Sequence, residues 1–77
     1  MKVIVTVMLK NGVLDPQGEA VKSGLGNLGF DGVSSVRQGK ILELDVAEGT
    51  SEATIADMCE KLLANTVIEK YSIEVAS

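Results

Sequence analysis

The stretch VIVTVML, residues 3–9, constrains the fold of this chain more than any other. It is rich in β-branched residues and alternates between two sets, as in a strand with two distinct faces. The first set is expected to face a hydrophobic core and consists of Val3, Val5, Val7 and Leu9. The second set is too apolar for ordinary solvent-facing surface and consists of Ile4, Thr6 and Met8. We therefore expect a sheet with a core on one face and a further contact on the other.

A helix is expected after this strand, over residues 16–28. Asp15 is a favoured N-cap residue, and Pro16 suits the first helical position. Apolar or small residues then recur at helical spacing, at Ala20, Val21, Gly24, Leu25 and Leu28. Gly29 fits a left-handed position that ends the helix, with Phe30 packing back after it.

The glycines of GLGNLGF, residues 24–30, match the G-x-G-x-x-G spacing of dinucleotide-binding loops, and Asp45 lies about twenty residues further on, where a ribose-binding acid would follow. Such a loop must connect the end of a strand to the start of a helix. Here the glycines lie inside a helix and at its end, so we interpret them as structural. Gly24 and Gly26 each destabilise a helix by about 1 kcal/mol relative to alanine, and we expect close packing of the helix on the sheet in return.

Two more strands, a second helix and a last strand follow. Residues 33–38 and 41–46 flank Gly39 and are expected to form a hairpin, with Leu42, Leu44 and Val46 facing inward. Thr50 or Ser51 can cap the second helix, and Asn65 can end it in a left-handed conformation. Its buried stripe is expected to consist of Ile55, Met58, Cys59, Leu62 and Leu63. Residues 67–75 form the last strand, with Tyr71, Ile73 and Val75 alternating with polar residues.

The order strand, helix, strand, strand, helix, strand predicts an α+β fold in a single domain, residues 1–77. Right-handed crossovers give a four-stranded antiparallel sheet with both helices on one face, the ferredoxin-like or split βαβ arrangement. The first and third strands would be central. Their outer faces would carry a candidate interface made of Ile4, Thr6, Met8, Ile41, Glu43 and Asp45.

Composition argues against several function classes. The net charge is −4 and only Phe30 and Tyr71 are aromatic, so we expect no nucleic-acid partner. One cysteine and no histidine exclude a disulfide within the chain and a Cys/His metal site by count. The N-terminal apolar run is too short for a membrane span or a signal peptide, so we expect a cytoplasmic protein with no membrane partner. A core of this size is marginal, so we expect association with other chains.

No group of residues assembles an active site. Cys59 lies on the apolar stripe of a helix without a histidine to activate it, so we interpret it as a buried, inert thiol. The pairs Glu43/Asp45 and Glu52/Asp57 could serve acid–base or Mg²⁺ chemistry. A solvent-exposed surface or a salt-bridging interface explains both pairs better than acid–base or Mg²⁺ chemistry does.

Basic residues near the expected hairpin offer a weaker possibility. Arg37, Gly39 and Lys40 could hold a phosphate, but one arginine and one lysine on a turn are common surface chemistry. Asp15 is interpreted as a helix cap rather than as a catalyst.

Two stretches resemble the PurS family of phosphoribosylformylglycinamidine synthase subunits. They are VLDPQGEAV, residues 13–21, and MCEKLLANTVIEKYSIEV, residues 58–75, and VSSVRQGKILEL between them resembles the hairpin of the same family. The positions that carry the resemblance are Leu14, Asp15, Pro16, Gln17, Gly18, Val36, Arg37, Gly39, Lys40, Cys59, Glu60, Lys61 and Asn65. The resemblance covers nearly the whole chain.

This resemblance implies a role in de novo purine biosynthesis. The complete synthase converts formylglycinamide ribonucleotide, ATP and glutamine into formylglycinamidine ribonucleotide, ADP, phosphate and glutamate. A PurQ subunit releases ammonia from glutamine, and a PurL subunit uses ATP and Mg²⁺ to activate the amide. By this resemblance the chain would have no catalytic residues and bind no cofactor. It would bridge PurL and PurQ, help ammonia to pass between them, and form dimers that can pair further.

Two other function classes stay open. A ferredoxin-like regulatory domain could sense a small molecule as a homo-oligomer, with the ligand between paired domains. A free-standing enzyme would need converging polar groups, and the sequence offers none.

Overall fold

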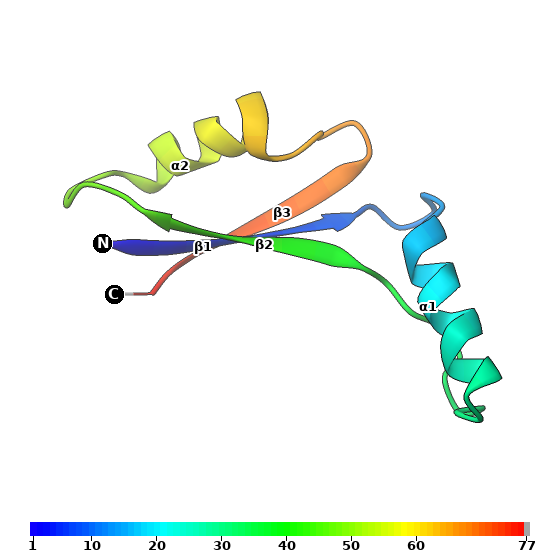
Figure 1. Cartoon of the computed structure of the whole chain (residues 1–77). Helices are drawn as coiled ribbons and strands as arrows, with labels where there is room; N and C mark the ends of the chain where they lie inside the picture. The colour runs from blue at the N-terminus through cyan, green and yellow to red at the C-terminus, as the bar shows by residue number, and fades with distance from the viewer. Residues whose placement is uncertain (77) are drawn as a thin grey trace.

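Three antiparallel strands form one sheet in the order β2-β1-β3, in a computed structural model that describes residues 1–76 (Figure 1). The central strand is β1 (Lys2–Leu9), flanked by β2 (Gly39–Asp45) and β3 (Glu69–Val75). Val5 of β1 lies opposite Leu42 of β2 and Ile73 of β3. The α+β class is therefore confirmed, as is the alternation of the first strand, in which Val3, Val5 and Val7 are buried and Leu9 is half-buried.

The expected four-stranded sheet is wrong, because residues 33–38 form no strand. The backbone N–H of Gln38 donates to the carboxylate of Asp15 at 2.8 Å. The carbonyl oxygen of Val36 lies so close to Gly18 that a Cβ there would come within 2.5 Å of it. This segment is thus held by the start of a helix rather than by a neighbouring strand. As a result β1 alone is central, and β2 is an edge strand.

The first helix, α1 (Pro16–Asn27), begins where the sequence predicts. The Asp15 side chain accepts the N–H of Gly18 at 2.8 Å, and Pro16 takes the first helical position. The chain leaves the helix through Gly29 at φ +94°, which confirms the expected left-handed residue.

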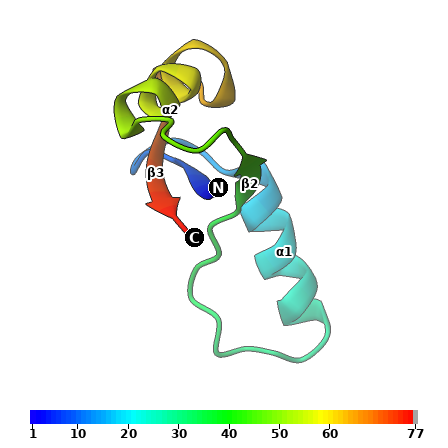
Figure 2. The same cartoon turned by 90° about the vertical axis from the view of Figure 1, so that its left-hand side faces the viewer.

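The expectation that both helices cover one face of the sheet is wrong for α1, which lies beyond the end of the sheet (Figures 1 and 2). Its apolar side chains therefore stay in contact with solvent, and Val21 is 44% exposed and Leu28 75% exposed. A Cβ added at Gly24 or Gly26 would meet nothing within 4 Å. The expected close packing of these glycines on the sheet is absent in this chain.

The second helix, α2 (Glu52–Met58), covers the core face of the sheet and continues into a π-helical turn, η1 (Cys59–Leu63) (Figure 1). The Ser51 hydroxyl accepts the N–H of Thr54 at 3.2 Å, which confirms Ser51 as the N-cap. The buried core consists of Val3, Val5, Val7, Ile55, Cys59 and Ala64. Half-buried residues packed against it include Leu42, Leu44, Val46, Tyr71 and Ile73.

The predicted stripe of the second helix is only partly correct. Ile55 and Cys59 are buried, but Met58 is 37% exposed and Leu62 is 83% exposed. For Leu62 the π-helical turn is the reason, since the N–H of Ala64 donates to the carbonyl of Cys59 five residues earlier. This wider turn directs Leu62 to solvent and places Ala64 in the core.

The expected left-handed end at Asn65 is also wrong. Within residues 1–76, positive φ angles occur only at Gly12, Gly29 and Gly49. The Asn65 side chain instead accepts the backbone N–H of Val67 at 3.2 Å, in a turn that leads to β3.

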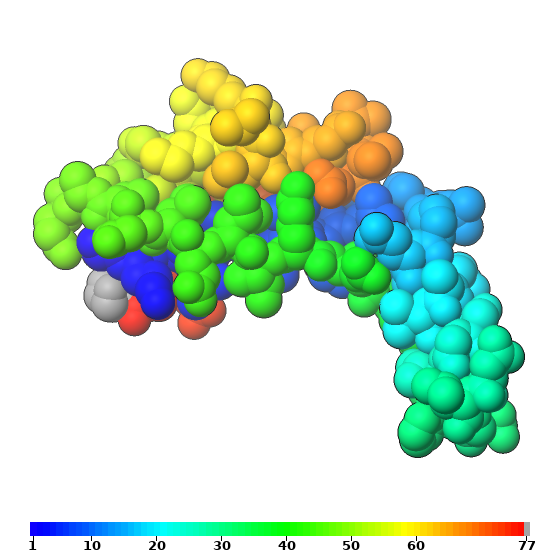
Figure 3. Space-filling view, viewed as in Figure 1, coloured from blue at the N-terminus to red at the C-terminus, as the bar shows by residue number. Residues whose placement is uncertain are grey.

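The molecule is elongated because one part projects from the sheet (Figure 3). Its Cα radius of gyration is 15.7 Å, whereas a compact chain of this length would have about 11.5 Å. We call residues 16–38, which comprise α1 and the segment that returns from it, the arm. We call the sheet with α2 and η1 the body. No helix within residues 1–76 is long and apolar enough to cross a membrane.

Candidate functional site

The six residues of the predicted interface share the face of the sheet opposite α2. Register places Ile4 opposite Glu43 and Thr6 opposite Ile41, so these side chains lie on the same side of the sheet. Ile41 is 67% exposed, whereas the β1 residues Ile4, Thr6 and Met8 are half-buried. The role of this face as an interface stays a prediction.

Ion pairs lie at one end of that face, where β1 begins and β2 ends. Lys2 lies 3.7 Å from the carboxylate of Glu43, and the N-terminal ammonium lies 3.6 Å from Asp45 and 3.4 Å from Glu48. The carboxylates of Glu43 and Asp45 thus take part in surface ion pairs. This arrangement agrees with the salt-bridging surface that the sequence favours over a magnesium site. Within residues 1–76 the structure places no three or more metal-binding side chains together.

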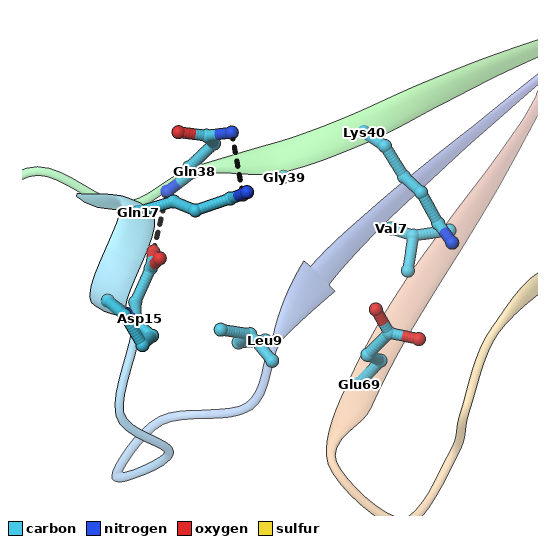
Figure 4. A pocket seen from close by; sticks show the side chains of 9 residues that line it. Val7, Leu9, Asp15, Gln17, Gln38, Gly39, Lys40 and Glu69 are labelled. Carbon is cyan, nitrogen blue, oxygen red and sulfur yellow. Dashed lines mark hydrogen bonds between the residues drawn. The ribbon is translucent and has the colours of Figure 1, made fainter. Parts of the chain in front are cut away.

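A cavity of about 320 Å³ lies where the arm joins the body (Figure 4). It is lined by Val7, Leu9, Asp15, Pro16, Gln17, Gln38, Gly39, Lys40 and Glu69. These residues come from the end of β1, from the start of α1 with its cap, and from the starts of β2 and β3 with the preceding Gln38. Lys40 and Glu69 stand on the side of the cavity away from Asp15 (Figure 4). The two carboxylates outnumber the single ammonium, so the charge in this cavity disfavours a phosphate.

Asp15 is the one buried charged side chain within residues 1–76, with 8% of its surface exposed. Its Oδ1 accepts the N–H of Gly18 and its Oδ2 accepts the N–H of Gln38, each at 2.8 Å. These bonds, the one from Gln38 first, lower the pKa of the Asp15 carboxyl below its usual value. The carboxylate is therefore a charged structural acceptor at neutral pH, which confirms it as a cap and adds a second role.

Arg37 does not point to a phosphate site. Its Nη2 donates to the carbonyl oxygens of Leu9 at 2.8 Å and Lys10 at 3.1 Å, at the end of β1. It borders a different hollow from the one that Lys40 lines. The structure therefore separates the two basic residues that the sequence suggested could act together.

The remaining positions of the family resemblance lie around the end of the second helix. The Cys59 thiol is buried, and burial followed by the charge of Glu60 raises its pKa. Tyr71 donates its hydroxyl to Glu60 at 2.8 Å, and this bond raises the pKa of the Tyr71 phenol. Lys61 pairs with Asp57 one helical turn earlier, at 3.0 Å. Cys59 is confirmed as a buried thiol, and its neighbours are engaged in local contacts.

Sequence reasoning missed the part played by residues 36–38. Gln38 contributes a backbone N–H and Val36 a backbone carbonyl, and neither group leaves a trace in a sequence pattern. The Gln38 side chain adds a bond from Nε2 to Oε1 of Gln17 at 2.9 Å. The positions of the resemblance thus divide into two groups, one at the junction of arm and body and one at the end of the second helix.

Residues 2–77 match the family model described as PurS: Phosphoribosylformylglycinamidine (FGAM) synthase. The subunit PurS of Synechocystis sp. is 51% identical over an alignment of 74 residues. The alignment covers 92% of this chain and 74% of that protein. The subunit PurS of Mycobacterium leprae is 47% identical over 72 residues, 94% of this chain and 91% of that protein.

Solved structures agree. The structure of Bacillus subtilis PurS matches with a TM-score of 0.90 at 47% identity, over 99% of this chain and 98% of that chain. A chain in the structure of PurLQS from Thermotoga maritima matches with a TM-score of 0.81 at 30% identity, over 95% of this chain and 93% of that chain. Because the family model matches residues 2–77, nearly the whole chain, the chain belongs to the PurS family.

Proposed function

We propose that this chain is the PurS subunit of FGAM synthase, the glutamine-using, ATP-dependent ligase complex of purine biosynthesis, and that it assembles PurL with PurQ. The observation that carries this proposal is the structural match to a chain of PurLQS, together with the family match over residues 2–77. We further propose that the chain helps ammonia to pass from PurQ to PurL and that it is cytoplasmic.

The chemistry of the described residues supports a non-catalytic role. Within residues 1–76, the groups best placed for chemistry are already used by the fold. Asp15 holds two backbone N–H groups, Arg37 holds two carbonyls, and Cys59 is fully buried. We therefore assign the use of ATP and Mg²⁺ to PurL and no cofactor to this chain. Nothing in this part of the chain favours the alternative of a small-molecule-sensing domain.

Exposed apolar residues support association, with this chain's own copies as a dimer or tetramer and with the two partners. On and beside the arm, Leu14 and Leu28 are each 75% exposed and Phe30 is 59% exposed. Burial of apolar surface contributes about 25 cal/mol per Å², so a contact with another chain that covers these residues would be stabilising.

The proposal is tested by reconstitution with purified PurL and PurQ. Glutamine-dependent synthesis of formylglycinamidine ribonucleotide should require this chain, whereas synthesis by PurL from added ammonium should need it much less. The chain alone should show no ATPase, glutaminase or ligase turnover. Equal glutamine-dependent rates with and without the chain would overturn the bridging role.

A further inference from the structure

We propose that Asp15, Gly18 and Arg37 form a latch that holds the arm at a fixed angle to the body. This inference goes beyond the proposed function, because it concerns the rigidity of the chain itself. The backbone passes between body and arm twice, outward over residues 10–15 and back over residues 36–38. The three latch residues lie at these two passages.

Asp15 connects the outgoing passage to the returning one. An N-cap needs one acceptor oxygen, as Ser51 shows at the start of α2. Asp15 uses Oδ1 in this way for Gly18, and its Oδ2 accepts the N–H of Gln38, 23 positions later in the chain. Both bonds involve a charged acceptor, and such bonds are roughly twice as strong as neutral ones. The second oxygen therefore serves as a cross-link rather than as part of the cap.

Arg37 connects the returning passage to the sheet. Its guanidinium spans two consecutive carbonyls, those of Leu9 and Lys10, where the central strand ends. Both bonds come from the one nitrogen Nη2, at 2.8 Å and 3.1 Å. With Asp15 and Arg37 together, the start of α1 is fixed to the return segment of the arm, and that segment is fixed to the end of β1.

Gly18 allows the two passages to touch. A Cβ at this position would come within 2.5 Å of the carbonyl oxygen of Val36 and 2.7 Å of Oδ2 of Asp15. Distances below about 3.0 Å would force one of the passages to shift. Glycine is thus required here by close approach, because its φ is not in the left-handed region.

Within a single chain, little else sets the direction of the arm apart from the bond between the Gln38 and Gln17 side chains at 2.9 Å. Helix α1 lies beyond the end of the sheet, and the sites of Gly24 and Gly26 face open space (Figures 1 and 2). The hydrogen bonds recorded for Leu28, Gly29 and Phe30 return to α1 itself. A helix without tertiary packing would turn freely about its two connections, so the bonds at those connections determine its angle.

The test measures the angle through a distance between spin labels in the full chain. Labels at Asn27→Cys, at the end of α1, and Ala53→Cys, in α2, report on arm and body, while the buried Cys59 stays unlabelled in the folded protein. An excess of unlabelled chain ensures that only distances within one chain are read. The variant Asp15→Ser keeps a good N-cap but is too short to reach Gln38, and Arg37→Gln removes the two bonds to β1. Ser51→Ala, which removes a cap that makes no cross-link, is the matched control.

We expect a narrow distance distribution for the parent and for Ser51→Ala, and a distribution at least twice as wide for the Asp15→Ser/Arg37→Gln double variant. Circular dichroism of the double variant should match that of the parent, which shows that α1 is intact. A double variant with the parent's width would overturn the latch. If the double variant loses helix, the single variant Arg37→Gln, in which the N-cap is intact, is measured instead. A distance distribution as narrow as the parent's would then overturn the latch. The experiment contains neither PurL nor PurQ, so its outcome is independent of the proposed function.

Discussion

Truncation of Ile55 and of Leu62 should have very different effects, although the two residues fall on one stripe of an ideal helix. Ile55 is 1% exposed and packs in the core, whereas Leu62 is 83% exposed because of the π-helical turn. Replacement of a buried isoleucine by alanine destabilises a protein by about 2–5 kcal/mol, and by valine by about 0.5–1.5 kcal/mol. Surface substitutions stay within about 0.5 kcal/mol. We therefore expect Ile55→Ala to lower the free energy of unfolding several-fold more than Leu62→Ala.

The size of the domain decides which variant is measurable. At roughly 0.05–0.15 kcal/mol per residue, a chain of this length has a free energy of unfolding of about 4–12 kcal/mol. Ile55→Ala removes a large share of that and could leave the chain unfolded, so Ile55→Val provides the graded version. A loss of about 1 kcal/mol should lower the melting temperature by about 4–8 °C.

Urea unfolding followed by circular dichroism measures these differences, as midpoints at an unchanged slope. The series should be repeated over a range of protein concentrations, because self-association stabilises the folded state by mass action. A Leu62→Ala loss that appears only at high concentration would show that another copy covers Leu62. Equal losses from Leu62→Ala and Ile55→Ala at the lowest concentration would refute the outward placement of Leu62.

Three more outcomes are expected. Gly24→Ala and Gly26→Ala should each stabilise α1 by about 0.5–1 kcal/mol, because the added methyl group meets open space; a loss of thermal stability in the dilute chain would contradict this. The lowered pKa of Asp15 means that its carboxylate stabilises the fold above the unfolded-state pKa of about 3.9, and that this contribution is lost as the pH falls through the folded-state pKa. The difference in urea midpoint between the parent and Asp15→Asn should therefore shrink below about pH 4, and a difference that stays constant would be evidence against it. Ile4→Glu combined with Met8→Glu should shift self-associated protein to a smaller species in sedimentation, and an unchanged size would exclude this face as the interface.

The elements predicted correctly are those that depend on local signals. The alternation of residues 3–9 requires only that one face be apolar, and Val3, Val5 and Val7 of that face are buried as expected. The start of α1 depends on Asp15 and Pro16, two adjacent residues whose side chains act within one turn. The same holds for Ser51 at the start of α2. In both helix starts the capping bond connects residues only three positions apart.

The predictions are wrong where the structure depends on a hydrogen bond to a distant residue, or on a helical hydrogen bond that is shifted by one residue. Residues 33–38 have a strand-like pattern, but the N–H of Gln38 donates to Asp15, far back in the sequence, and these residues form no strand. The outward position of Leu62 follows from the π-helical turn over Cys59–Leu63, after which the N–H of Ala64 donates to the carbonyl of Cys59 instead of that of Glu60. A periodicity of 3.6 residues cannot reveal a single turn that is wider. For the candidate site, the cap at Asp15 was predictable and its cross-link was not.

The chemistry of the junction agrees with a subunit that works by its shape. Asp15 and Arg37 are the kinds of residue that could act on a substrate or bind a phosphate, and both belong to the positions that resemble the PurS family. In the structure both carboxylate oxygens of Asp15 and the Nη2 of Arg37 bond to backbone groups at the two passages between body and arm. Gly18, which also carries the resemblance, is needed there because no larger residue fits against Val36. Contacts between arm and body therefore account for these three positions of the family resemblance.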